Sequence, residues 1–503
     1  MESLLQLIPE KELSTEQKRL RPRMFGTFSP LYRLLSGEPT QLYDFGWDNH
    51  RNCTIWRDNG TVICIGHCFY EEYEPHGVLF SLYDNAYDEE LQLSCGIYGE
   101  NDAAIAATAT FFWSLKHPVE TELCVLRIHG RRKFPVTVFE IEQLLQILES
   151  NPERHVDLQT GTWSDVQAAV LATRPLSLRL SNVFAWADNG SAFVDALQGR
   201  SSPFRSLCID FDNKDTPFSK ENLKRLFELE NNKFDWLRMD RLEDEELVLL
   251  AFSAKTDYLE YKMDAQDVEP EDFKEINIRA KTLDLTLFLD WVDNWDELVV
   301  AFFHRVAELG HMERLSLSLK YMDWRSSEEP ERNEFDTASL AQALICLIKG
   351  NPNLQHLDVS DILWCVDDEP HLPQIFEAME DHPSLHEVLI EGCKDESEDD
   401  GFKYSGALGY AALERLLSRN RYIKIFNFQG KRITNGTTID ELYRLNACYV
   451  GSLQLITDTL VPDSRFHLVI TALVQSTSGR FRATGVLLSH HTDLLCELVT
   501  ELL

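Results

Sequence analysis

A short apolar unit recurs along the middle of the chain, and its copies share one internal pattern. Apolar and polar residues alternate within each copy, which is typical of a short strand with one face buried. Several copies fit the leucine-rich pattern L-x-x-L-x-L, for example Leu354, Leu357 and Val359 within NLQHLDVSD. The eleven copies begin at Leu123, His155, Leu176, Arg205, Trp236, Tyr258, Lys281, Met312, Asn353, Leu385 and Tyr422.

The segments between the copies have apolar residues at spacings of three and four, the period of an amphipathic helix. Further helices are predicted from Ser219 to Leu229, where Ser219 can cap the first turn, and from Thr337 to Ile348. Two of the apolar faces consist of Phe139, Leu144, Leu145 and Leu148, and of Val299, Phe302, Phe303 and Val306.

One strand and one helix cannot bury both of their apolar faces alone, whereas a stack of such units can. The pattern therefore predicts an α/β fold, an irregular leucine-rich-repeat solenoid with parallel strands inside and helices outside, over residues 121–435. Because the copies are unevenly spaced and the consensus asparagine is mostly missing, we expect a distorted arc. The alternation also permits a doubly wound α/β sheet, but eleven strand units exceed what one open sheet usually holds.

The two ends of the chain have different patterns from the array. Residues 25–120 predict a small β-rich N-terminal cap module, with a hairpin turn at Asn59-Gly60 and a helix from Asp102 to Leu115. Residues 1–24 form an N-terminal segment that is a candidate for flexibility. Residues 436–503 predict a helical C-terminal cap, because apolar residues recur there at helical spacing. Two acidic stretches, Trp324 to Asp336 and Lys394 to Gly401, predict solvated loops.

Composition and charge narrow the class of partner. Hydrophobic residues make up 44% of the chain and charged residues 26%, values that suit a folded protein. The formal net charge of -35 disfavours binding to nucleic acid. It favours a protein partner, and a basic protein in particular. No secretory leader or long apolar run is present, so no membrane partner is predicted. The eleven scattered cysteines favour a reducing compartment, the cytoplasm or the nucleus.

The repeat copies, NPNLQHLDVSD above all, resemble those of leucine-rich-repeat proteins of the ribonuclease-inhibitor-like class, over roughly residues 120 to 430. Outside the array, phrases such as AATATFFWSLKHP, LYRLNACYVGS and LLSHHTDLLCEL are similar to uncharacterised algal leucine-rich-repeat proteins. This resemblance implies recognition of a protein on the concave strand face and implies no activity.

The residue between the last two apolar positions of each copy points away from the core. Alternating arginines and aspartates at these positions could bind a polar partner through hydrogen bonds. They could instead form ion pairs between neighbouring strands and only keep the face hydrated. Both interpretations stay open on the sequence. The predicted partner-binding residues are Arg127, Asp157, Arg179, Asp210, Arg238, Ser316, Asp358 and Asn427.

The sharpest candidate for metal chemistry combines His50 and Cys53 with Cys64, His67 and Cys68, on either side of the hairpin. This order is not a common zinc pattern. On a strand, Cys64 and Cys68 would share one face while His67 points to the other. Small half-buried thiols are therefore the favoured interpretation, and neither a metal nor a cofactor is predicted.

No phosphate loop, nucleophile elbow or kinase signature occurs, and His490-His491 favours a capping or surface position. The sequence therefore predicts a non-catalytic scaffold that binds a protein. One alternative is a substrate adaptor of a ubiquitin ligase, although no three-helix pattern follows Gln6 to Leu13. Another is an acidic inhibitor of a basic enzyme. Catalysis would require distant repeats to bring a nucleophile and perturbed acids together.

Overall fold

The computed structural model describes most of the 503 residues, in two compact units, Met1–Tyr261 and Lys262–Leu503. In each unit, parallel strands alternate with helices, which confirms the predicted α/β class. Among the residues described, no helix is long and apolar enough to cross a bilayer. The described residues are 4–24, 27–34, 39–41, 53–66, 76–84, 92–116, 124–129, 134–211, 216–230, 234–242, 244–289, 295–320, 336–363, 371–391, 407–457, 467, 469–471 and 481–496.

The first unit begins with a mainly antiparallel group of strands. Their order is β1–β4–β5–β6–β8–β7–β9, with only β4 and β5 parallel. The predicted hairpin is confirmed, because β5 and β6 join through Gly60 at a φ of 83°. The strands are β1 (Leu5–Leu7), β4 (Leu31–Leu34), β5 (Cys53–Arg57), β6 (Thr61–Ile65), β7 (Gly77–Asp84) and β8 (Gln92–Tyr98), and a separate pair is β2 (Arg23–Met24) and β3 (Thr27–Phe28).

Residues 4–24, the candidate flexible segment, pack onto this group of strands. Strand β1 pairs with β4, and helix α1 (Thr15–Leu20) begins with a capping box in which Ser14 and Gln17 satisfy each other's backbone N–H groups. Leu13 and Leu20 are buried in one cluster with Leu31, Val62, Cys64 and Tyr98. This part of the segment is therefore held by apolar packing.

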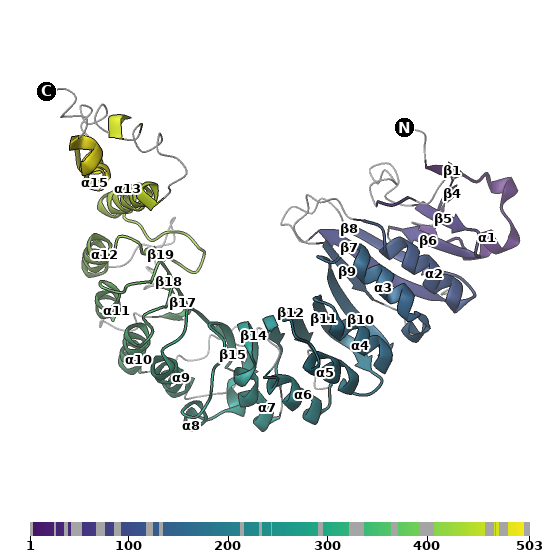
Figure 1. Cartoon of the computed structure of the whole chain (residues 1–503), viewed down its shortest axis with the longest axis horizontal. Helices are drawn as coiled ribbons and strands as arrows, with labels where there is room; N and C mark the ends of the chain where they lie inside the picture. Colours follow the sequence, from purple (N-terminus) through teal and green to yellow (C-terminus); the bar gives the residue numbers. More distant parts are fainter. Residues whose placement is uncertain are drawn as a thin grey trace. The chain divides into compact units, whose positions relative to one another are not determined.

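Six parallel strands in sequence order complete the first unit. A row of apolar side chains in register faces the helices, and the helices cover this one side of the sheet (Figure 1). The strands are β9 (Cys124–Ile128), β10 (His155–Trp163), β11 (Ser177–Trp186), β12 (Phe204–Asp210), β13 (Phe234–Met239) and β14 (Thr256–Asp264). The helices are α2 (Asp102–Trp113), α3 (Ile141–Ser150), α4 (Asp165–Thr173), α5 (Ser191–Gln198), α6 (Lys220–Phe227) and α7 (Glu245–Leu250). The buried row consists of Leu126, Val156, Leu178, Leu207, Leu237 and Leu259.

The second unit repeats this arrangement with a shorter series of parallel strands and ends in helices. The strands are β15 (Thr282–Phe288), β16 (Arg314–Lys320), β17 (His356–Leu363), β18 (Glu387–Glu391) and β19 (Lys424–Phe426). The helices are α8 (Pro270–Phe273), α9 (Trp295–Leu309), α10 (Thr337–Gly350), α11 (Leu372–Met379), α12 (Ala407–Arg419), α13 (Thr438–Thr457) and α15 (Phe481–Ser489). Of the two acidic stretches predicted as loops, Asp336 caps α10, and the rest lies outside the described residues.

Buried polar side chains link the helix ends of successive repeats in the second unit. Asn351 accepts a hydrogen bond from the Met312 N–H at 3.0 Å and donates to the Val306 carbonyl at 3.1 Å. His382 binds the Asn351 carbonyl at 3.0 Å, and Asn420 donates to the carbonyl of Met379 at 3.1 Å. We call Asn351, His382 and Asn420 the helix-end ladder. Their side chains add hydrogen bonds to backbone groups near the ends of neighbouring helices.

Candidate interaction face

The candidate site is the side of the first unit's sheet that faces away from the helices. On β7, Phe80 and Leu82 are buried, and the Phe80 ring packs against Phe112 of α2 with centroids 5.5 Å apart. Because side chains alternate along a strand, Ser81 points to the other side. The open face is defined as this other side of β7 and β9–β14.

One row of the open face crosses the six parallel strands in register. It lies between two buried apolar rows and consists of Arg127, Asp157, Arg179, Cys208, Arg238 and Glu260. Four of these residues, Arg127, Asp157, Arg179 and Arg238, are among the predicted ones. On β12 the residue of this row is Cys208, between buried Leu207 and Ile209, and the predicted Asp210 lies on the same face in the next row. Asp210 lies opposite Ser181, two positions farther along the strand.

The arginines of this row are held by acidic side chains. Arg127 Nε lies 2.7 Å from Asp157 Oδ2, and Arg179 forms an ion pair with Asp210. Arg238 Nε lies 3.3 Å from Glu260 Oε1. The three arginine side chains remain 29%, 33% and 28% exposed. The structure thus contains the cross-strand pairing that was one of the two interpretations, while part of each arginine still faces solvent.

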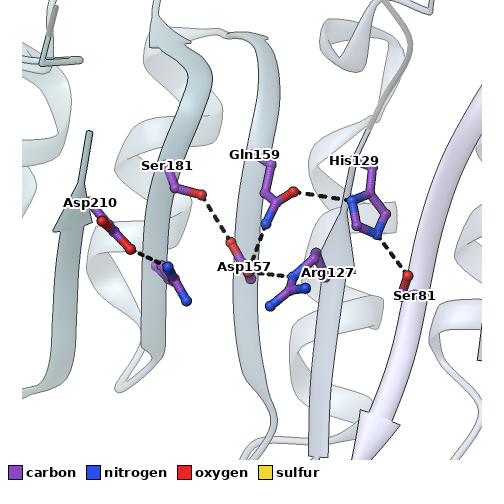
Figure 2. A network of polar contacts seen from close by, with 8 residues as sticks. Ser81, Arg127, His129, Asp157, Gln159, Ser181 and Asp210 are labelled. Atoms are coloured by element: carbon purple, nitrogen blue, oxygen red, sulfur yellow. Dashed lines mark hydrogen bonds and ion pairs between the residues drawn. The ribbon is translucent and has the colours of Figure 1, made fainter. Parts of the chain in front are cut away.

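Asp157 is the centre of a polar network (Figure 2), although its side chain is only 1% exposed. Besides Arg127, it accepts hydrogen bonds from Gln159 Nε2 at 3.2 Å and Ser181 Oγ at 3.4 Å. A buried carboxylate is tolerated when charge-assisted hydrogen bonds replace its hydration. Because these donors come from three strands, the network holds this part of the face in one arrangement.

A local irregularity brings two of these donors to Asp157. Leu158 of β10 pairs with Leu180 of β11, but Thr160 then pairs with Val183, so the register shifts. Gln159 lies at this shift on one strand and Ser181 and Asn182 on the other. Asn182 has a φ of 58°, a left-handed conformation that asparagine tolerates better than most residues. Bulges of this kind re-aim side chains, and regular alternation along the sequence does not reveal them.

An aromatic pair lies on the same face, next to Arg238 and Glu260. Trp236 and Tyr258 are opposite each other in register, and their rings stack with centroids 5.8 Å apart and planes at 14°. Both side chains are half-buried. Sequence analysis missed them as site residues, although each lies two positions before a row residue and therefore on the same face.

Burial changes the acidity of three side chains on or beside the face. Burial lowers the pKa of His155 to about 4; nearby Asp157 opposes this shift, and Arg179 and Arg127 add to it. Burial also lowers the pKa of His129. The pKa of the Cys208 thiol rises to about 12, mainly through burial. At neutral pH both imidazoles are therefore uncharged and Cys208 is protonated.

Two of the predicted site residues of the second unit, Ser316 and Asp358, lie on its strands. Asp284, Ser316 and Asp358 form one row in register across β15, β16 and β17, and Asp358 accepts hydrogen bonds from the Ser360 N–H and hydroxyl. The prediction for Asn427 was wrong. Strand β19 ends at Phe426, and Asn427 Oδ1 instead accepts hydrogen bonds from the backbone N–H groups of Gln429 and Lys431 in a turn.

The two hairpin cysteines that the structure describes lie on opposite sides of the sheet. Cys53 pairs with Ile65 and Cys64 with Thr54, so the two thiols point to opposite sides of the sheet. Burial raises the pKa of Cys53 to about 12, which keeps this thiol protonated. His50, His67 and Cys68 lie outside the described residues. Within the part that the structure describes, no three His, Cys, Asp or Glu side chains gather at a possible metal site.

The two adjacent histidines near the C-terminus do not share a surface position. The His491 side chain is buried, with an exposure of 0%, and its Nε2 lies 2.9 Å from Ser452 Oγ of α13. The His490 ring packs edge-on against Tyr449, with centroids 4.5 Å apart. His491 stands immediately before the helical residues 492–496, and its carbonyl accepts a hydrogen bond from the Leu495 N–H, so it occupies a capping position, while its buried side chain ties the chain after α15 to α13.

No protein-family model matches this chain, and no curated protein is significantly similar to it. Functional inference therefore rests on the geometry of the open face.

Proposed function

We propose that this chain is a leucine-rich-repeat-like recognition protein that binds a protein partner through the open face of its first unit. The observation that carries the proposal is the combination of Arg127, Arg179 and Arg238 with the Trp236–Tyr258 pair on the side of the sheet that faces away from the described helices. Tryptophan, tyrosine and arginine are the residues most enriched among the energetically dominant contacts of protein interfaces. Recognition, and not catalysis, is the role proposed for this row.

The charge of the row bears on the kind of partner. Arg127, Arg179 and Arg238 are balanced by Asp157, Asp210 and Glu260, so these six side chains carry no net charge although the whole chain carries -35. A basic enzyme would be attracted by an acidic surface. These three balanced ion pairs instead favour a partner of mixed polar and apolar character, and they give no support to the inhibitor alternative.

The test is affinity capture from a native cell extract with the intact chain and three variants, followed by mass spectrometry. Trp236→Ala and Arg238→Ala remove half-buried side chains of the open face. Arg225→Ala is the matched control, because Arg225 on α6 forms an exposed ion pair with Asp195 on the helix side. Arg127 is left unchanged: Asp157 beneath it is almost fully buried, so a loss of binding there could not be separated from a loss of folding.

We expect each open-face variant to weaken capture of a specific partner about 30-fold, which corresponds to roughly 2 kcal/mol, and Arg225→Ala to retain it. Circular dichroism of each variant checks the fold. If all three variants capture the same partners equally, the open face is not the binding surface. If the intact chain captures no specific partner, the recognition role itself is refuted.

A further inference from the structure

Ser81 and His129 form a hydroxyl–imidazole pair at the β7–β9 edge of the open face. Ser81 Oγ lies 2.7 Å from His129 Nε2, within strong hydrogen-bond distance. The other ring nitrogen, Nδ1, lies 3.1 Å from Gln159 Oε1 (Figure 2). Ser81 is 8% exposed, and His129 immediately follows β9.

The direction of each hydrogen bond in this chain follows from Asp157. An ionised carboxylate can only accept, so Gln159 must turn its Nε2 donor toward Asp157 and its Oε1 acceptor toward His129. His129 Nδ1 must then carry the proton, and its Nε2 is left as an acceptor. The Ser81 hydroxyl therefore donates to Nε2, which is the orientation in which an imidazole can take up a serine proton.

We propose that Ser81 is a base-activated nucleophile toward carboxylic esters, with His129 as its general base. Ser81 Oγ attacks the ester carbonyl carbon while His129 Nε2 takes up the hydroxyl proton. The carbon–oxygen bond to the alcohol then breaks, and His129 returns the proton to the departing alkoxide. Water attacks the resulting acyl-Ser81 in the same way, which releases the carboxylic acid and restores the hydroxyl.

The surroundings suit this role. Burial and nearby Arg127 lower the pKa of His129, while Gln159 and Asp157 partly oppose that shift, so the imidazole is an unprotonated base at neutral pH. Arg127 lies opposite Ser81 in the β7–β9 register, and its guanidinium is bonded to Asp157, which holds the carboxylate that orients Gln159 and, through it, His129. Gln159 and Asp157 act as positioning residues, because neither is bonded directly to the reacting hydroxyl.

The inference goes beyond the proposed recognition role and does not depend on it. Its test therefore uses no partner: the full chain is treated with a fluorophosphonate probe, which forms a phosphorus–oxygen bond to an activated serine and releases fluoride. Peptide mass spectrometry then locates the label. Ser94 is a built-in control, because it pairs with Ser81 in register on β8 and, within the described residues, has no hydrogen bond to a histidine.

We expect the label on Ser81 and not on Ser94, complete loss in Ser81→Ala, and unchanged labelling in Ser94→Ala. His129→Gln should slow labelling by about 100-fold or more, the usual contribution of a general base. The labelling rate should rise with pH through a midpoint below 6.5, and Gln159→Glu should move that midpoint upward by adding negative charge beside Nδ1.

Equal labelling of Ser81 and Ser94, or no label on either in the correctly folded intact chain, would overturn the proposal and leave the pair a structural hydrogen bond. A second measurement follows release of nitrophenol from p-nitrophenyl acetate, with Ser81→Ala as reference. Equal rates from the intact chain and this variant would also refute the proposal. Partner capture is scored separately, so either inference can fail alone.

Discussion

The helix-end ladder of the second unit allows a stability prediction with a magnitude worked from individual hydrogen bonds. Asn351 is fully buried, with an exposure of 0%, and Asn351→Ala removes three side-chain hydrogen bonds. The carbonyls of Val306 and Leu347 keep their backbone partners, the N–H groups of Gly310 and Asn351 itself. The buried Met312 N–H loses the acceptor that holds it.

An unsatisfied buried N–H costs about 1–3 kcal/mol, and each of the two lost bonds to carbonyls costs about 0.5–1 kcal/mol. We therefore expect Asn351→Ala to lower the free energy of unfolding of the second unit by about 3 kcal/mol. Asn353 lies two residues farther along the same turn and is exposed, so Asn353→Ala is the matched control, with an expected change within about 0.5 kcal/mol.

The assay is hydrogen exchange of the intact protein, resolved on peptides from α9, β16 and α10. A loss of 3 kcal/mol corresponds to exchange about 150-fold faster for amides that exchange through opening of this unit. Peptides of the first unit provide an internal reference. If Asn351→Ala and Asn353→Ala exchange at equal rates in these peptides, the ladder contributes no stability and the hydrogen-bond reasoning is refuted.

Three further predictions concern the first unit and partner binding. His155 has a pKa of about 4 in the folded protein and about 6.5 in the unfolded chain, so between these values the unfolded chain binds the extra proton. The free energy of unfolding should therefore fall as the pH decreases from 6.5 to 4, by roughly 2 kcal/mol at pH 5. In urea denaturation measured over this pH range, His155→Gln should remove most of that decrease. Equal pH slopes in both proteins would contradict this assignment. Cys53 is buried and has a pKa of about 12, so iodoacetamide at pH 8 should not alkylate it, whereas exposed Cys496 should react. Mass spectrometry measures both rates. Alkylation of the two cysteines at similar rates would show that the hairpin exposes Cys53 to solvent. Partner capture should weaken only slightly between 50 and 500 mM salt because the three ion pairs of the open face are charge-balanced. A steep loss would favour the acidic-inhibitor alternative.

The alternation of apolar and polar residues was enough to predict which side of each strand is buried. It placed Leu126 toward the helices and Arg127 on the open face, because a strand permits no other arrangement once one face is covered. It could not determine the register between neighbouring strands. For this reason the sequence did not show that Cys208, and not Asp210, lies in register with Arg179, and Asn427 was assigned to a strand that ends one residue earlier.

The sequence could not predict contacts between segments that lie far apart along the chain. Ser81 and His129 meet only because β7 turns back antiparallel onto β9, and nothing in the local pattern of either strand specifies that pairing. The sequence also did not reveal the asparagines that link neighbouring repeats. Asn351 and Asn420 follow helix ends, outside the strand motif, and there they bond backbone groups of the preceding repeat.

Asp157 connects the two roles inferred for the open face. Its two oxygens receive donors from Arg127, Gln159 and Ser181, so one buried carboxylate fixes both the start of the arginine row and the orientation of the His129 ring. Such a carboxylate is stable only while all of its donors stay in place, because their loss would leave a charge in a site with almost no access to water. This dependence favours a rigid face. A rigid face binds a partner with little loss of conformational entropy, and it holds Ser81 within reach of its base.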